Sequence, residues 1–296
     1  MFVQSARFVE SHAGKLQDIS VYGQESNPTT WKMATMNLAI RGIDANLGPK
    51  PDDTFANDLF STLRFDYILA NPPFNLKEWG GEKLKDDPRW DYAIPPEGNA
   101  NFAWLQHMIH HLSVKGKMGV VLANGALSSQ QSGEDIIRQK IVEADLVDGI
   151  VALPPQLFFN TQIPVSLWII SKSKEQSKQT LFIDARNLGT MITRKLRELT
   201  DEDIKKISTA FDSFHEGTFK EEKGFSAVAD IDKIRSQNYI LTPGRYVGME
   251  ECIDDEEPFS DKIERLSNEL TKLMQRSNEL QKEILKNLHE IRVNVK

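Results

Sequence analysis

The distribution of apolar residues changes character along the chain, and each part predicts a different kind of structure. Up to about residue 190, short continuous apolar runs alternate with segments in which apolar residues recur every three or four positions. Continuous runs are typical of buried strands, and the longer period is typical of helices that pack on them. We therefore predict an α/β fold for residues 1–190, with helices on both faces of a mostly parallel sheet.

The apolar runs also predict where individual elements lie. Strands are expected within 16–25 and at 65–70, 118–123, 147–153, 165–171 and 180–184, and helices at 27–42, 101–114 and 136–144. No helix separates the last predicted strands, so we expect the sheet to finish with an antiparallel pairing.

Beyond residue 190 the chain becomes more polar and loses the alternating pattern. Residues 191–257 are predicted to form a helical and irregular region that ends in an acidic, proline-terminated linker at 250–258. A long helix is expected from about 259 to 293, in the last of three regions, 258–296. Its apolar positions follow a spacing of three and four, interrupted by Ser277 and Asn287; they are Ile263, Leu266, Leu270, Leu273, Leu280, Ile284 and Ile291. Such a stripe needs burial, either against a helix of the same chain or against a partner.

The amino-acid composition excludes some classes of protein but does not indicate a function. Hydrophobic residues make up 40% of the 296 residues and charged residues 27%, as in ordinary globular proteins. The net charge of −7 means that any nucleic-acid contact must be local or shared with a partner. Cys252 is the only cysteine, which excludes an internal disulfide. Neither a membrane-spanning run nor a secretory signal is present, so the cytoplasm is the expected compartment.

The histidines do not predict a metal site. His107, His110 and His111 share one predicted helix, and the first and last of them lie on one face. The glutamate that would complete an H-E-x-x-H motif is missing, so packing is the better interpretation and we expect no metal.

The strongest chemical motif is Asn71-Pro72-Pro73-Phe74, hereafter the NPPF segment, which directly follows the predicted strand at 65–70. Ligands of such sheets bind beyond the carboxyl ends of the strands. An exocyclic amine on a base is a poor nucleophile because its lone pair is delocalised into the ring. The Asn71 amide oxygen and the Pro72 carbonyl are suited to accept its two hydrogens and to stabilise the charge that develops on nitrogen. The prolines fix φ, and Phe74 is suited to stack on an extruded base. The alternative is a turn that merely ends the strand.

The NPPF segment resembles the catalytic motif of amino-methyltransferases, and the whole chain resembles the modification subunit of a type I restriction-modification system. Further segments carry this resemblance: VYGQE at 21–25, GNANFAWLQHMI at 98–109, GVVLANGALSS at 119–129, LPPQLFFNTQIPVSLWI at 153–169 and SQNYILTPGRYV at 236–247. The resemblance implies a Rossmann-like fold that transfers a methyl group from S-adenosylmethionine to adenine N6 in DNA.

The resemblance also implies roles for individual residues. Glu25 corresponds to the acidic residue that binds the cofactor's ribose hydroxyls, and Asp53 with Thr54 to the position that contacts its adenine. Phe159 lies in the segment that corresponds to the base pocket, where it is expected to stack on the flipped adenine. Without the family, Glu25 and Asp53 would be read as exposed turn residues and Phe159 as part of the core rim.

The same resemblance implies which partners the chain has and which parts of the family's site it contains. The terminal helix is expected to dock on the specificity subunit, which reads the DNA, in a complex with a second modification subunit and the restriction subunit. The family places a glycine-rich cofactor loop and a helical domain before the segment that matches Met1. We therefore expect the amine-holding half of the site to be more complete here than the cofactor-holding half.

Two alternatives remain open from the sequence. The chain is either an enzyme or a catalytically inactive subunit that acts only in assembly. A methyltransferase that acts on an amine of a protein or of RNA would face an equally poor nucleophile, so the NPPF segment alone does not exclude it. The later segments and the long terminal helix favour DNA.

Overall fold

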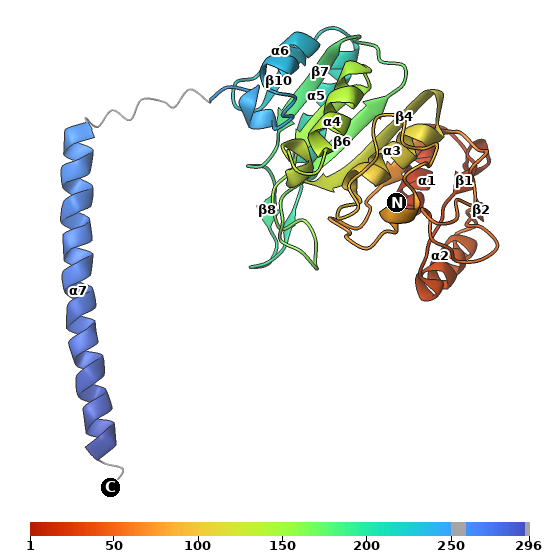
Figure 1. Ribbon diagram of the computed structural model, residues 1–296. Coiled ribbons are helices and arrows are strands. Elements are labelled where there is room, and N and C mark those ends of the chain that lie inside the picture. Colours follow the sequence, from red (N-terminus) through yellow and green to blue (C-terminus); the bar gives the residue numbers. More distant parts are fainter. Residues whose placement is uncertain (250–258, 294–296) are drawn as a thin grey trace. The chain divides into compact units, whose positions relative to one another are not determined.

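The computed structural model describes residues 1–249 and 259–293, and it divides the chain into two compact units (Figure 1). The first unit is Met1–Gly248 and the second is Met249–Lys296. The predicted linker at 250–258, with Cys252, lies outside the described residues.

A six-stranded sheet forms the centre of the first unit, in the order β10-β7-β5-β6-β4-β3. Its strands are β3 (Phe65–Ala70), β4 (Leu112–Ala123), β5 (Val147–Ala152), β6 (Val165–Ser171), β7 (Gln179–Asp184) and β10 (Ser226–Asp230). Strand β10 comes from beyond residue 190 and pairs with β7, so it extends the sheet that the earlier residues build. The fold is a Rossmann-like α/β fold, as predicted.

The direction of the strands differs from the sequence prediction. Strands β3 and β4 are parallel, as are β5 and β7, but β6 runs antiparallel between β4 and β5. Strand β10 is also antiparallel to β7, so the sheet finishes with an antiparallel pairing, as expected, but with a later strand than the sequence indicated. The prediction of a mostly parallel sheet was wrong, because three of its five pairings are antiparallel. Because β6 is antiparallel to β5, it ends beside the first residues of β5. The short link 172–178 can therefore cross to the other side of β5, where β7 pairs with β5 in parallel. Lys174 fastens that link, because its Nζ donates to the carbonyls of Val147 at 2.9 Å and Gln179 at 2.5 Å.

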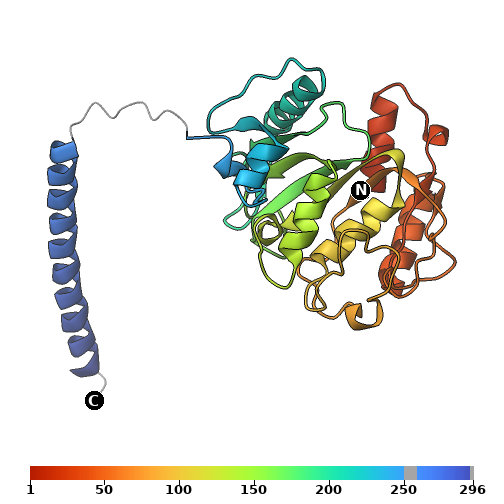
Figure 2. The ribbon, with the colours of Figure 1, turned by 45° about the horizontal axis from the view of Figure 1, so that its top comes forward.

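Helices cover the two faces of the sheet unequally (Figure 2). The larger core lies under α3 (Asn101–His111), α4 (Glu134–Glu143) and α6 (Ile231–Ser236), and α5 (Asp201–His215) packs on the opposite face. Trp168 at the centre of β6 is fully buried. Burying a residue of this size contributes on the order of 2–3 kcal/mol, so the central strands carry much of the stability.

A smaller group of elements builds its own core from the first 50 residues. It consists of α1 (Phe2–Ser11), α2 (Pro28–Ile40) and the parallel pair β1 (Val21–Tyr22) and β2 (Ala45–Asn46). The predicted start of α2 is confirmed, since Asn27 Oδ1 accepts the amides of Thr29 and Thr30. The strand expected within 16–25 is limited to two residues, and a 3-10 turn precedes it.

Two other boundaries were predicted incorrectly. The helix expected at 101–114 ends at His111, and β4 begins at Leu112, six residues before the predicted strand. Val114 is 85% exposed, so the apolar residues that extended the helical pattern do not pack on its face. The charged stretch after residue 190 begins with the hairpin of β8 (Thr190–Met191) and β9 (Arg197–Glu198), and α5 starts only where Thr200 and Asp203 form a capping box.

Short 3-10 helices complete the first unit. They are η1 (Leu16–Asp18), η2 (Gly81–Lys83), η3 (Asn124–Leu127) and η4 (Pro243–Arg245).

The second unit contains α7 (Phe259–Val293), which confirms the predicted long helix. The apolar stripe is uncovered within the part of α7 whose side chains are described: Ile263, Leu266, Leu270, Leu273, Leu280 and Ile284 are 43–62% exposed. Ile291, the last predicted member of the stripe, lies outside the side chains described. Among all the helices described, α7 included, none combines the length and apolarity needed to cross a membrane.

Candidate active site

The NPPF segment leaves the carboxyl end of β3, at the edge where the sequence placed it. The last residue of β3, Ala70, pairs with Val120 of β4, and Asn71 follows directly. Pro72 is buried, whereas Asn71 is exposed. Within the described residues the Asn71 amide has no hydrogen-bond partner, so both its oxygen and its nitrogen are available to a ligand.

Two distant segments meet at the aromatic end of the NPPF segment. The rings of Phe74 and Phe158 lie edge to face, with centroids 5.8 Å apart. Phe159, which the sequence singled out, is 90% exposed and points away from the core. The structure therefore places the predicted base-pocket segment beside Phe74, with Phe158 making the contact and Phe159 left uncovered.

The predicted cofactor residues come from two loops that the backbone holds together. The amide of Asp52 donates to the carbonyl of Glu25 at 3.0 Å. Gln24 strengthens this junction: its amide nitrogen donates to the Asn57 carbonyl at 2.8 Å, and its oxygen accepts the amide of Leu59 at 3.1 Å. One carboxylate oxygen of Glu25 accepts the Asn27 amide at 2.8 Å.

Asp53 and Thr54 form a turn that a buried arginine supports from below. Asp53 Oδ1 accepts the amides of Phe55 and Ala56, at 2.7 and 3.0 Å. Arg89, only 6% exposed, donates to the carbonyls of Thr54 at 2.9 Å and Phe55 at 2.6 Å. Its fork also binds Asp87, at 2.8 Å from Nε and 2.7 Å from the terminal nitrogen. The backbone around Asp53 is thus fixed by a charged group with little freedom to move.

A buried aromatic cluster joins the cofactor loop to the segment that follows the NPPF segment. The ring of Phe55 lies 5.0 Å from Trp79 and 4.2 Å from Trp104. Trp90 and Leu76 belong to the same cluster. No hydrogen bond or ring contact links Glu25 or Asp53 directly to residues 71–74 in the described part of the chain, so this cluster is the physical connection between the two halves of the candidate site.

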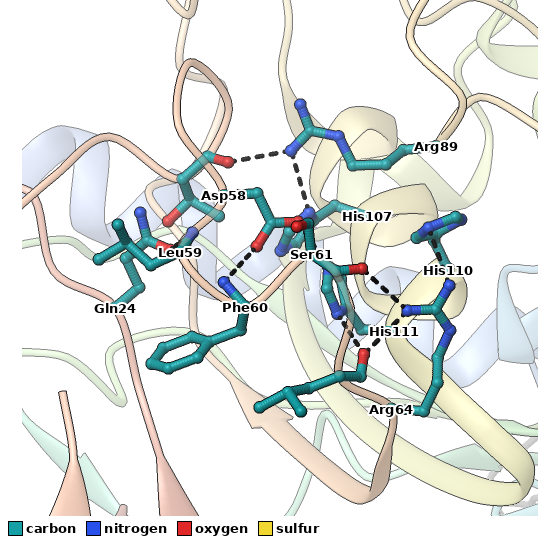
Figure 3. Close-up of polar contacts among 12 residues, drawn as sticks. Gln24, Asp58, Leu59, Phe60, Ser61, Arg64, Arg89, His107, His110 and His111 are labelled. Carbon is teal, nitrogen blue, oxygen red and sulfur yellow. Dashed lines mark hydrogen bonds and ion pairs between the residues drawn. The ribbon is translucent and has the colours of Figure 1, made fainter. Parts of the chain in front are cut away.

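A second polar group, formed by Asp58, His107 and His111, lies beneath the same loop (Figure 3). His111 Nε2 is 2.8 Å from Asp58 Oδ2, and its Nδ1 is 3.1 Å from the Leu63 carbonyl. Burial raises the pKa of Asp58, but the hydrogen bond and charge of His111 outweigh it and lower that pKa to about 2.

The three ligand-type side chains of this group do not favour a metal ion. Arg89 donates to His107 Nδ1 at 3.2 Å, which places a permanent cation beside the group and leaves the proton on the other ring nitrogen. A comparable group, Asp148, Glu175 and His215, has Lys117 2.6 Å from the Glu175 carboxylate. Because a cation already accompanies each group, the sequence prediction that the function needs no metal remains our interpretation.

The stability of the first unit is expected to decrease as the pH falls below about 6.5, the ordinary imidazole pKa. Burial lowers the pKa of His107, and the neighbouring charges of His111 and Arg89 add to this effect. The unfolded chain therefore binds a proton at His107 in a range where the folded protein does not, and acidification favours unfolding. Urea titrations at pH 7 and pH 5 measure the loss.

In the same titrations His107→Gln should show a smaller loss between the two pH values than the wild type. His12→Gln, at an exposed histidine, should keep the wild-type slope. A His107→Gln protein with the full wild-type pH dependence would contradict this assignment.

Sequence reasoning missed the residues that support the site rather than line it. Gln24, Arg89 and Phe158 each contact a residue at least 33 positions away, which no local pattern reports. The sequence held only weak signals for two of these residues: Gln24 is the neighbour of the predicted cofactor residue Glu25, and Phe158 is the neighbour of the predicted stacking residue Phe159. Phe102, on the helix that follows the NPPF segment, is fully buried and its ring packs edge to face on Trp168, so its role is in the core.

The Rossmann-like α/β sheet carries the NPPF segment directly beyond the end of β3, and Glu25 follows β1 of a separate two-stranded sheet. This fold is that of the S-adenosylmethionine-dependent methyltransferases. Residues 1–255 match the N-6 DNA Methylase family, and the chain belongs to that family.

Comparison with individual proteins confirms the resemblance seen in the sequence. The chain is 48% identical to the type I restriction enzyme HindI methylase subunit of Haemophilus influenzae, over 97% of this chain and 65% of that protein. It is 44% identical to the MjaIX methylase subunit of Methanocaldococcus jannaschii, over 96% of this chain and 52% of that protein. The chain thus spans between half and two thirds of the length of these relatives.

A solved structure agrees with the sequence relatives. The type I restriction-modification methyltransferase subunit from Streptococcus thermophilus superposes with a TM-score of 0.69 at 30% identity, over 77% of this chain and 48% of that one. The EcoKI M protein superposes with a TM-score of 0.68 over 93% of this chain and 64% of that one, and at 16% identity it supports the fold alone.

Proposed function

We propose that this chain transfers a methyl group from S-adenosylmethionine to the N6 amine of adenine in DNA, as a modification subunit of a type I restriction-modification complex. The observation that carries the proposal is the free amide of Asn71 at the carboxyl end of β3, directly before two prolines and Phe74. Family membership and the relatives' names support the substrate class.

Asn71 and Pro72 act on the amine through hydrogen bonds. The Asn71 amide oxygen and the Pro72 carbonyl accept the two N–H groups, which draws the nitrogen lone pair out of the ring and directs it at the methyl carbon. Positive charge that develops on nitrogen then meets two fixed dipoles. With S-adenosylmethionine bound, the amine would take the methyl group and the sulfur would leave as a neutral thioether. The cationic amine would then lose its proton to water, so the chain needs no histidine base.

Aromatic side chains hold the base once it has left the duplex. Phe74 stacks on the adenine and is itself supported by the ring of Phe158. Phe159, 90% exposed, is available for a second stacking contact on the DNA side. Base–aromatic stacking contributes about 1–3 kcal/mol for each base, which offsets part of the energy of unstacking.

The residues present fit the nucleoside part of the cofactor. Glu25 keeps a carboxylate oxygen without a partner among the described residues, as a ribose hydroxyl requires. Asp53 uses one carboxylate oxygen for its own turn and retains the other for the adenine amine. When bound, S-adenosylmethionine supplies a methyl group on a positively charged sulfur.

Titration calorimetry with S-adenosylmethionine tests the cofactor assignment on the purified chain. We expect binding, and we expect Glu25→Gln to weaken it by about one to two orders of magnitude, as for a lost hydrogen bond to a charged group. Glu216→Gln, at an exposed position outside the candidate site, should bind like the wild type. A wild-type chain without detectable binding would instead favour a subunit that acts only in assembly.

The complex with DNA is expected to depend on partners. A chain with a net charge of −7 is poorly suited to bind DNA alone, and the uncovered apolar stripe of α7 offers a surface for assembly. We propose that α7 docks on the specificity subunit, with a second modification subunit and the restriction subunit in the full complex.

Replacing a stripe residue should weaken this docking. Leu273→Asp removes an apolar contact and buries a charge, so we expect the specificity subunit to dissociate at least tenfold more easily in a quantitative pull-down. Gln275→Asp adds the same charge on the other side of α7 and serves as the matched control. Equal binding by the two variants would exclude the stripe as the contact.

A further inference from the structure

The NPPF segment is held at its far end by the side chain of a residue 26 positions later. The amide of Asn75, which follows Phe74, donates to Asn101 Oδ1 at 3.0 Å. In return Asn101 Nδ2 donates to Asn75 Oδ1 at 2.9 Å. Asn101 is only 2% exposed, whereas Asn75 is exposed, so the contact is buried on the Asn101 side alone. Asn75 Oδ1 also accepts Asn99 Nδ2, at 3.4 Å.

The contact between Asn75 and Asn101 lies at a residue whose backbone conformation is unusual. Asn75 has a φ of 53°, in the left-handed region that non-glycine residues adopt infrequently, asparagine more than most. Here the chain turns away from the sheet into the long connection that leads to α3. The neighbouring Ala100 amide donates to the Leu76 carbonyl at 2.9 Å, so residues 75 and 76 are fastened to the start of α3 at two points.

The Asn101 amide is not used to cap its own helix. The N-cap of α3 is Ala100. The backbone N–H of Asn101 donates to Asn99 Oδ1 at 3.0 Å, so it too is satisfied without the Asn101 side chain. A polar side chain buried at the first turn of a helix ordinarily bonds to that helix, whereas this one reaches across to Asn75. Its hydrogen bonds therefore serve the segment after Phe74.

We propose that Asn101 is a positioning residue for methyl transfer, because it fixes the direction in which the NPPF segment leaves β3. The inference rests on the proposed function. Pairing with β4 fixes the segment at Ala70, the prolines restrict its middle, and Asn101 fixes it at Asn75. With both ends held, the Asn71 oxygen and the Phe74 ring keep the relative placement that in-line transfer to a stacked base demands.

The chain offers a close control on the same helix. Gln106 is 1% exposed, and its amide holds a different part of the connection: the oxygen accepts the Tyr92 amide at 2.9 Å, and the nitrogen donates to the Ala93 carbonyl at 2.8 Å. Asn101→Ala and Gln106→Ala each remove one buried amide from α3, but only the first releases the NPPF segment.

The test compares the two variants by hydrogen–deuterium exchange and by steady-state methylation of DNA, each in the assembled complex. Asn101→Ala should speed exchange in peptides that cover residues 70–77 and lower kcat by about 10- to 100-fold, with the Kd for S-adenosylmethionine changed less than about twofold. Gln106→Ala should speed exchange around residues 92–94 and lower kcat less than about threefold. In a cycle with Asn75→Gly, the losses should be less than multiplicative, because the pair acts as a unit.

The outcomes separate the inference from the proposed function. Unchanged exchange in residues 70–77, or equal kcat losses in Asn101→Ala and Gln106→Ala, would overturn the positioning role. A wild-type complex that transfers no methyl group to DNA would overturn the proposed function, and this is seen before any variant is compared.

Discussion

Asn71→Ala is expected to lower kcat for DNA methylation by about 100- to 1000-fold, the loss typical of removing one fixed dipole aimed at developing charge. The Asn71 amide has no partner among the described residues, so its removal should leave folding intact. Because it acts on the amine and not on the cofactor, the Kd for S-adenosylmethionine should change less than about twofold. Single-turnover methylation together with calorimetry separates the two effects.

Asn187→Ala is the matched control for this experiment. Asn187 is also exposed, and it lies outside the candidate site on the loop after β7. We expect it to retain the wild-type kcat. If the two variants methylated DNA at the same rate, the NPPF segment would be a strand-ending turn and not the amine-holding element.

Arg89→Ala is expected to cause the largest loss of stability, about 3–5 kcal/mol in the free energy of unfolding. The change leaves the Asp87 carboxylate, 12% exposed, without its cation and removes the donor from two carbonyls of the cofactor loop. Burial raises the pKa of Asp87, and the Arg89 hydrogen bonds and charge reverse this and hold it below its usual value. Urea denaturation measures the loss, and weaker binding of S-adenosylmethionine should accompany it.

Arg186 provides a control of the same local geometry. It binds Asp184, two residues earlier, with its Nε at 2.8 Å and a terminal nitrogen at 2.6 Å, as Arg89 binds Asp87. The Arg186 side chain is 50% exposed and Asp184 is 10% exposed, so Arg186→Ala also leaves a shielded carboxylate without its cation. We expect it to cost less than Arg89→Ala, because Arg89 also supports two loop carbonyls. Similar losses in the two variants would mean that the carbonyl contacts of Arg89 contribute little.

Parts of the fold that depend on local signals were predicted accurately. Strand β3 has the predicted bounds, since its apolar run is stopped by two prolines that cannot continue a ladder. The cap at Asn27 fixed the start of α2 for an equally local reason. The place of the NPPF segment at the end of β3 was also predictable, because it directly follows the strand in the sequence. Its chemical role stays a prediction.

Features that depend on long-range contacts were not predictable. The place of β6 inside the sheet is decided by pairing with β4 and β5 together, and its own sequence reads like any buried strand. Arg89 and Asn101 looked like an ordinary loop cation and helix residue, and their roles appear only when residues 26–35 positions away are brought to them. The predicted roles of Glu25, Asp53, Thr54 and Phe159 rest on the family and stay predictions.

The most direct test of the account is mass spectrometry of nucleosides from DNA incubated with the assembled complex and S-adenosylmethionine that carries a deuterated methyl group. We predict that the label appears in N6-methyladenine and that Asn71→Ala removes it. Label in cytosine, in the protein or in RNA, or the absence of label from a complex that binds the cofactor, would contradict the assignment of the NPPF segment to an adenine amine.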